Sequence, residues 1–146
     1  MSIICGDLFE ANYASSSLAH CVSRDLRMGQ GIAILFRQKI GRMDELEKAN
    51  AKVGDIIVLK KARQFIYYLV TKEKYNGKPT YGTLRQTLLK MRDHAVKNEV
   101  GEICMPKIGC GRDNLNWEVV QQMIRTSFFH SDVKITVYQL GKTKFS

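Results

Sequence analysis

Apolar residues recur along the chain with two periods, one typical of helices and the other of strands. The clearest helical period follows Pro79-Thr80 and continues over several turns at Tyr81, Leu84, Leu88, Met91 and Ala95. A strand is predicted over residues 65–71, where every position through Val70 is apolar or aromatic. Such a continuous apolar run indicates a strand with both faces buried, as in the middle of a covered sheet.

Shorter apolar segments complete the predicted order of elements. Strands are predicted over residues 3–5, 19–22, 56–59, 102–106 and 134–139. Helices are predicted over residues 31–41, over a short segment through Leu46, and over residues 117–128 with Asn116 as the N-cap. Because strands alternate with helices, we expect an α/β fold in which helices cover both faces of a central sheet.

Length and composition restrict the class of protein. With 146 residues, of which 45% are hydrophobic, the chain has the size of one domain and can bury a core. No segment approaches the ~18 consecutive apolar residues of a membrane-spanning helix, so no membrane partner is expected. The four cysteines form no C-x-x-C pair and the three histidines are scattered, so no metal site is expected. The opening residues lack a secretory signal, which favours the nucleus or the cytoplasm.

The chain is strongly basic. It has 23 Lys and Arg against 14 Asp and Glu, which gives a net charge of +9 and a pI of about 9.5. The excess is spread along the sequence rather than gathered in a tail. This charge fits an anionic partner such as a nucleotide or nucleic acid, but it also fits a surface charged only for solubility. Composition does not decide between the two.

Two glycine pairs stand at predicted strand-to-helix junctions, where the carboxyl ends of parallel strands collect ligands. They are Gly29-Gln30-Gly31 and Gly109-Cys110-Gly111. Glycines at such junctions let backbone amides approach a phosphate closely. Neither pair matches the G-x-G-x-x-G dinucleotide motif or the P-loop, and each pair alone is also explained by ordinary turn glycine. Two such pairs in one small domain favour a phosphate site.

Several side chains near these junctions are candidates for chemistry. Lys72 ends the buried strand, where a neutral amine could attack a sugar carbon; a lysine that only extends into solvent is the alternative. Asp113 follows the second glycine pair and is either a general acid or base or a turn residue. A catalytic Cys110 with His20 as its base is disfavoured, because Cys110 suits a tight turn and His20 suits a strand interior.

Several ungapped strings resemble the macrodomain family, and within it the terminal ADP-ribose protein glycohydrolases, also described as O-acetyl-ADP-ribose deacetylases. The strings are residues 6–9 (GDLF), 17–23 (SLAHCVS), 27–33 (RMGQGIA), 67–72 (YYLVTK), 78–81 (KPTY), 105–113 (MPKIGCGRD) and 135–138 (ITVY). Because the strings are long and run in order from about Ser2 to Leu140, the resemblance is specific.

The resemblance implies a three-layer α/β/α macrodomain over residues 1–140, with a mixed sheet of roughly six strands, and a short C-terminal extension over residues 141–146. It implies that Lys72 attacks the distal ribose of ADP-ribose and that Asp113 assists proton transfer. The ligand-binding residues that it implies are Asp7, Leu8, His20, Ser23, Gly29, Gly31, Lys107, Ile108, Gly109, Cys110, Gly111, Arg112 and Leu140. No cofactor is implied.

By this resemblance, the protein removes mono-ADP-ribose from glutamate and aspartate side chains and hydrolyses O-acetyl-ADP-ribose. Its partners are then ADP-ribose and ADP-ribosylated proteins, and we expect it to act as a monomer. A non-catalytic ADP-ribose-binding module is the alternative from another class, and the presence of both Lys72 and Asp113 favours the enzyme. A third alternative uses the basic surface to bind nucleic acid or to act on ADP-ribosylated nucleic acid.

Overall fold

A mixed sheet forms the centre of the molecule. Its strands are β1 (Ser2–Cys5), β2 (Ser16–Ser23), β3 (Ile56–Lys61), β4 (Gln64–Lys72), β5 (Glu102–Met105) and β6 (Lys134–Gln139). These six strands form one sheet in the order β1-β6-β5-β2-β4-β3. Of its neighbouring pairs, β3 and β4 are antiparallel and the others are parallel. The computed structural model describes residues 1–10 and 16–139. Because β2, β4 and β5 run parallel, their carboxyl ends meet at one edge of the sheet.

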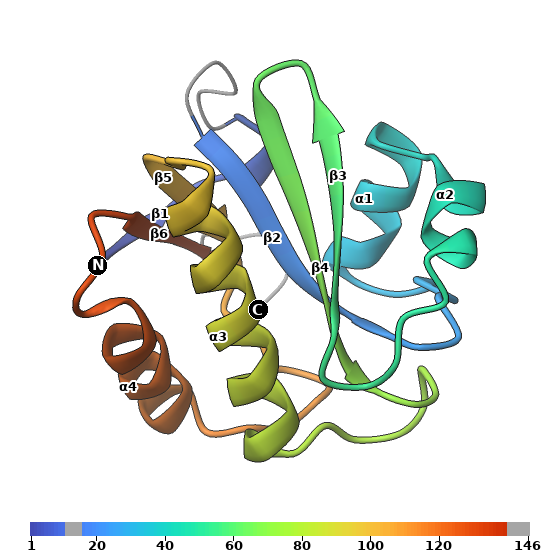
Figure 1. Ribbon diagram of the computed structural model, residues 1–146. Helices are drawn as coiled ribbons and strands as arrows, with labels where there is room; N and C mark the ends of the chain where they lie inside the picture. Colours follow the sequence, from blue (N-terminus) through green and yellow to red (C-terminus); the bar gives the residue numbers. More distant parts are fainter. Residues whose placement is uncertain (11–15, 140–146) are drawn as a thin grey trace.

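Helices cover both faces of this sheet. They are α1 (Ile32–Lys39), α2 (Met43–Lys48), α3 (Tyr81–Lys97) and α4 (Trp117–Phe128), with a short 3-10 helix, η1 (Leu8–Glu10), after β1. Figure 1 shows α3 and α4 on one side of the sheet and α1 and α2 on the other. The predicted three-layer α/β/α arrangement with a mixed six-stranded sheet is confirmed. Leu140 and the predicted extension over residues 141–146 lie outside the described residues.

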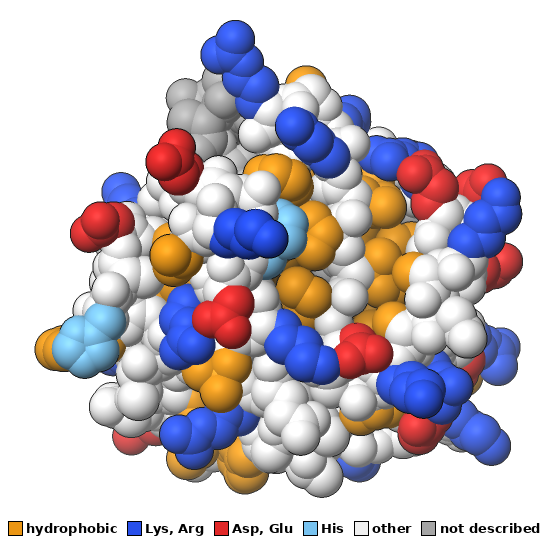
Figure 2. Space-filling view, viewed as in Figure 1, with side chains coloured by type: hydrophobic (Ala, Val, Ile, Leu, Met, Phe, Trp, Pro, Cys, Tyr) orange, Lys and Arg blue, Asp and Glu red, His pale blue; other side chains and the backbone are white. Residues whose placement is uncertain are grey.

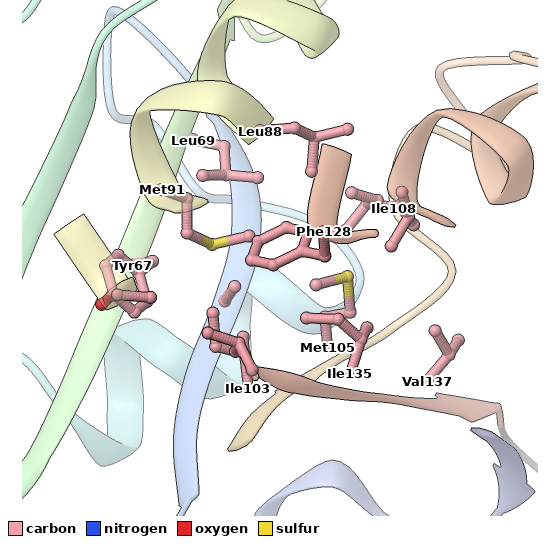
Figure 3. Close-up of a cluster of buried hydrophobic side chains, with 14 of the residues drawn as sticks. Tyr67, Leu69, Leu88, Met91, Ile103, Met105, Ile108, Phe128, Ile135 and Val137 are labelled. Carbon is pink, nitrogen blue, oxygen red and sulfur yellow. The ribbon is translucent and has the colours of Figure 1, made fainter. Parts of the chain in front are cut away.

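Strand β4 separates two hydrophobic cores. Tyr67 and Leu69 belong to the first core, between the sheet and the α3–α4 layer, and Figure 3 shows them with Leu88 and Met91 of α3. Ile66, Tyr68 and Val70 point into the second core, under α1 and α2. All five β4 residues are at most 1% exposed, which confirms the prediction of a strand buried on both faces. Burial at this scale stabilises a domain by roughly 1.5–3 kcal/mol per large apolar side chain.

The beginnings of α3 and α4 are capped as their sequences indicate. Thr80 forms a capping box with Thr83, and the Asn116 side chain accepts a hydrogen bond from the Glu118 amide. The hydroxyl of Thr83 also donates to the Thr71 carbonyl, with 2.8 Å between the oxygens. The first turn of α3 is therefore joined to the end of β4, directly before Lys72.

Strand β2 begins earlier than the apolar pattern indicates, because two serines at its start are buried and hydrogen-bonded. The Ser16 hydroxyl donates to Glu102 at 2.7 Å, and Ser17 accepts from the Phe65 amide at 3.0 Å.

Charge is distributed in the way the sequence predicts: Lys and Arg side chains are spread over the face shown in Figure 2, with acidic side chains among them. Within residues 1–10 and 16–139, no helix has the length and apolar character needed to cross a membrane.

Candidate active site

A cavity of about 620 Å³ opens at the carboxyl ends of β2, β4 and β5. Its walls come from the ends of these strands and from the loops that follow them, over residues 21–23, 28–33, 71–72, 75–78 and 106–113. Both glycine pairs of the sequence lie in its lining. Ligand pockets in proteins commonly enclose about 300–1,000 Å³, so this cavity has room for a nucleotide-sized molecule.

Lys72 and Asp113 meet inside this cavity. Lys72 ends β4, and Asp113 lies in the loop between β5 and α4. Lys72 Nζ donates to Asp113 Oδ1 at 2.7 Å, and the two side chains are only 14% and 16% exposed. A largely enclosed amine in contact with a carboxylate provides a potential nucleophile next to a group that can accept its proton.

The β5–α4 loop presents its backbone to the cavity. Gly109 has a φ of +73°, which favours glycine, and a Cβ at this position would also displace the Leu115 side chain, whose Cδ1 would lie 2.9 Å away. Gly111 has a φ of +88° and faces open space, because no atom lies within 4 Å of a Cβ built there. A ligand phosphate can therefore approach the amides around Gly111 without meeting a side chain.

Replacing Gly111 with glutamate is expected to abolish ADP-ribose binding, because a negatively charged side chain would occupy the space open to a phosphate. The positive φ also costs about 1–2 kcal/mol of stability for any residue with a Cβ. Calorimetric titration with ADP-ribose measures the affinity, and a thermal melt confirms that the variant is folded.

Gly101→Glu is the matched control for this variant. Gly101 also has open space around its Cβ position, but it has no positive φ and does not line the cavity. This control is expected to bind ADP-ribose like the parent protein. Unchanged affinity in folded Gly111→Glu would remove the β5–α4 loop from the binding site.

Two cysteine thiols line the cavity, and the surroundings of both make them poor nucleophiles. Burial, with a smaller contribution from Asp113, raises the pKa of Cys21 to about 12. Burial also raises the pKa of Cys110. Because only a thiolate attacks readily, both groups stay protonated and weakly reactive at neutral pH. The structure thus agrees with the expectation that Cys110 is no catalytic thiol.

His20 lies in the second core rather than in the cavity wall. Its side chain is fully buried and stacks on Phe36, with 3.7 Å between the ring centroids and an interplanar angle of 11°. Among the described residues, neither ring nitrogen has a hydrogen-bond partner. Desolvation by burial lowers the pKa of His20 to about 3, so the ring is neutral at ordinary pH. A direct contact between His20 and a ligand is therefore not supported by this position.

Replacing His20 with phenylalanine is expected to flatten the dependence of stability on pH. In the parent protein, the unfolded chain protonates His20 below pH 6.5 while the folded protein does not until about pH 3. The free energy of unfolding should therefore decrease as the pH falls through this window, by up to about 1.4 kcal/mol per pH unit from this group. Denaturant unfolding at several pH values measures the slope. An unchanged slope in the variant would contradict the buried, neutral state of His20.

The structure brings most predicted site residues together. Ser23, Gly29, Gly31, Lys72 and the residues from Lys107 to Asp113 all line the cavity. Asp7, Leu8 and His20 do not: Asp7 accepts a hydrogen bond from the Phe9 amide, and Leu8 packs in the second core. Leu140 is outside the described residues.

Part of the cavity wall was not predicted from the sequence. Cys21, Thr71, Tyr75 and Lys78 line the cavity although no binding role was predicted for them. Their position directly at or after the buried strands was the available signal. Lys78 Nζ also donates to the Arg112 carbonyl, which joins the β4–α3 loop to the residue before Asp113. Within residues 1–10 and 16–139, no group of three or more potential ligands is placed to hold a metal ion.

A comparison with protein families agrees with this fold and cavity. The Macro domain family model matches residues 19–124. The chain therefore belongs to the macrodomain family, as the sequence strings predicted.

Named relatives refine the comparison. ADP-ribose glycohydrolase OARD1 of Homo sapiens is 50% identical over 135 residues, which span 92% of this chain and 88% of that protein. The macrodomain of Mycobacterium tuberculosis DarG superimposes with a TM-score of 0.86 at 23% identity, over 96% of this chain and 97% of that one. Thermosipho africanus DarTG in complex with ADP-ribose gives a TM-score of 0.82 at 17% identity, over 99% of this chain and 42% of that one. At these identities the two structures support the fold alone.

Proposed function

We propose that this protein is an ADP-ribose glycohydrolase that removes mono-ADP-ribose from glutamate and aspartate side chains and hydrolyses O-acetyl-ADP-ribose. The observation that carries the proposal is the contact between Lys72 and Asp113 inside the cavity. The activity named for the human relative, at 50% identity over most of both chains, supports it. A purely ADP-ribose-binding module would not need a largely enclosed amine and a carboxylate at 2.7 Å.

The cavity offers a site for the diphosphate of ADP-ribose. The backbone around Gly109 and Gly111 lies on one side, and the start of α1 after Gly31 lies on another. Amides at a helix start and at glycine-rich turns bind anions. Lys107 and Arg112 add positive charge to the lining. The proposal requires that a diphosphate bound there leaves the distal ribose next to Lys72, which lines the same cavity.

The first chemical step forms a bond between Lys72 and the ribose. Asp113 Oδ1 accepts a proton from Lys72 Nζ, which frees the nitrogen lone pair. The nitrogen then attacks the anomeric carbon of the distal ribose, and the bond from this carbon to the ester oxygen breaks. The carboxylate of the modified side chain leaves with the bonding electrons, and so does acetate when O-acetyl-ADP-ribose carries its ester on the anomeric oxygen.

The second step releases ADP-ribose. Asp113 first passes the proton taken from Lys72 to the departing carboxylate and is again a base. The ribose ring of the adduct opens, as the bond from the anomeric carbon to the ring oxygen breaks and a proton moves from the nitrogen to that oxygen, which leaves an iminium. Water adds to the iminium carbon while Asp113 accepts a proton from the water. Asp113 returns this proton to the nitrogen, the carbon–nitrogen bond breaks as the new hydroxyl becomes the aldehyde of ADP-ribose, and the proton released from that hydroxyl restores the ammonium of Lys72. Removing either residue should therefore stop the cycle without removing the diphosphate site.

Release of ADP-ribose from a glutamate-modified protein tests the proposal. The parent protein should liberate free ADP-ribose and restore the unmodified glutamate, whereas Lys72→Ala should do neither. Binding of ADP-ribose without release by the parent protein would instead identify a non-catalytic binding module. The nuclear or cytoplasmic location, the monomeric state and the nucleic-acid partner stay predictions.

A further inference from the structure

Tyr75 is held in the cavity wall by two contacts with the loop between β2 and α1. It lies three residues after Lys72, in the β4–α3 loop, and its half-buried side chain lines the cavity. Its backbone amide donates to Asp25 Oδ2 at 3.1 Å. The guanidinium of Arg27, in the β2–α1 loop, lies 4.5 Å from the centre of the Tyr75 ring, which is the distance of a cation–π contact. The position of the ring is thus determined by contacts to its backbone and to its face.

Asp25 joins the loops that carry this pair. Its Oδ1 accepts from the Ser23 hydroxyl at 2.5 Å and from the Arg27 amide at 3.4 Å, while its Oδ2 accepts from Tyr75. Burial alone would raise the pKa of Asp25, but these hydrogen bonds lower it, so the carboxylate stays charged. Backbone hydrogen bonds from Arg24 to Lys72 and from Asp25 to Glu73 pair the same two segments. The Tyr75–Arg27 pair is therefore preorganised rather than formed on binding.

The charges near this pair are mostly positive. Lys74 is exposed on the Tyr75 loop, and Lys78 lies further along it in the cavity lining. The acidic residue of this loop, Glu73, pairs with Arg24 at 3.5 Å. Asp25 lies beside Arg27 and offsets part of this charge, but Lys74 and Lys78 form no ion pair with any residue in 1–10 and 16–139. A polypeptide that crosses this part of the wall therefore meets an aromatic face and an excess of positive charge, which attracts carboxylates.

We propose that Tyr75 and Arg27 determine substrate specificity by contacting the polypeptide part of the substrate, and that they favour acidic residues next to the modified side chain. The inference rests on the proposed function, because it takes the reacting bond to lie at Lys72. That bond is where ADP-ribose ends and the polypeptide begins, so the polypeptide leaves the cavity past the residues nearest Lys72. Tyr75 is the aromatic residue of the loop that follows Lys72, and a tyrosine face packs well against peptide planes and aliphatic stems.

The inference is tested with three peptides that carry the same ADP-ribosylated glutamate. They differ only in the residues on either side of it, which are Glu, Gln or Lys. The parent protein should show the lowest KM with Glu flanks, by roughly tenfold relative to Lys flanks. Tyr75→Ala should raise the KM for the Glu-flanked peptide roughly tenfold, with kcat and the affinity for free ADP-ribose unchanged. Tyr75→Phe keeps the ring and should behave like the parent protein.

Two further variants separate a specific contact from a general effect. Arg27→Gln should reduce the preference for Glu flanks, and the Tyr75→Ala/Arg27→Gln double variant should be little worse than Tyr75→Ala, because the two residues act as a unit. Phe129→Ala removes an aromatic side chain that is 75% exposed outside the cavity, and it should leave every KM unchanged.

Equal KM values for the three peptides would overturn the inference. An equal loss of affinity for free ADP-ribose and for peptide in Tyr75→Ala would also overturn it, since the ring would then contact ADP-ribose itself. If the parent protein releases ADP-ribose from none of the peptides, the proposed function fails as well. If the parent protein releases ADP-ribose from all three peptides with equal KM values, only the specificity inference is rejected and the proposed function stands.

Discussion

Replacing Lys72 with arginine should abolish ADP-ribose release as completely as replacing it with alanine. Arginine keeps the positive charge opposite Asp113, but its guanidinium is not deprotonated in proteins and cannot act as the nucleophile. If Lys72 only held a phosphate or carboxylate by its charge, arginine would preserve much of the activity. Single-turnover release of ADP-ribose from a glutamate-modified protein measures the difference between these two roles.

Lys90→Arg provides the matched control for this substitution. Lys90 lies on α3 and pairs with Asp55 on the surface, outside the cavity lining. This variant should release ADP-ribose at the parent rate. Substantial activity in Lys72→Arg would contradict covalent catalysis and would leave Lys72 with an electrostatic role.

Replacing Asp113 with alanine should separate catalysis from binding. Asp113 provides the side-chain acceptor of Lys72 Nζ within the described residues, so turnover should fall by a factor of ~100 or more without its carboxylate, the usual scale for a positioned acid or base. The affinity for ADP-ribose should change little, because the amides of the β5–α4 loop remain. Calorimetry and steady-state kinetics on the same preparation measure the two quantities.

Asp93→Ala is the corresponding control, since Asp93 is an exposed carboxylate on α3 that pairs only with Arg92 among the described residues. It should have no effect on kcat or on binding. Near-normal turnover in Asp113→Ala would refute the role in proton transfer. Loss of both binding and turnover would instead make Asp113 a residue that positions the ligand.

Patterns local to one segment predicted the fold well. The apolar run of β4 indicated a strand buried on both faces, and the five residues from Ile66 to Val70 are almost fully buried. The cap at Asn116 was also predicted, because a helix start needs a side-chain acceptor at one position. The start of β2 was not, since Ser16 and Ser17 are buried only through partners far along the chain.

Residue type and position at or after strand ends marked Lys72, Asp113 and the glycines of the β5–α4 loop as candidates but left their roles open, and the family resemblance implied the roles. The structure brings these residues to one cavity. The Asp25–Tyr75 contact was not predictable, because it joins two loops that are distant in sequence. His20 was assigned to the site from its neighbours in a shared string, but a strand alternates its faces, and the ring points into the second core.

Trapping the adduct is the most direct test of whether Lys72 forms a covalent bond to the ribose. A hydride donor added during turnover should reduce the adduct to a stable one, which peptide mass spectrometry can locate. We expect the ADP-ribose-derived mass on Lys72 in the parent protein and no adduct in Lys72→Arg. An adduct on Lys74 or Lys78, or turnover without any trappable adduct on Lys72, would contradict the account.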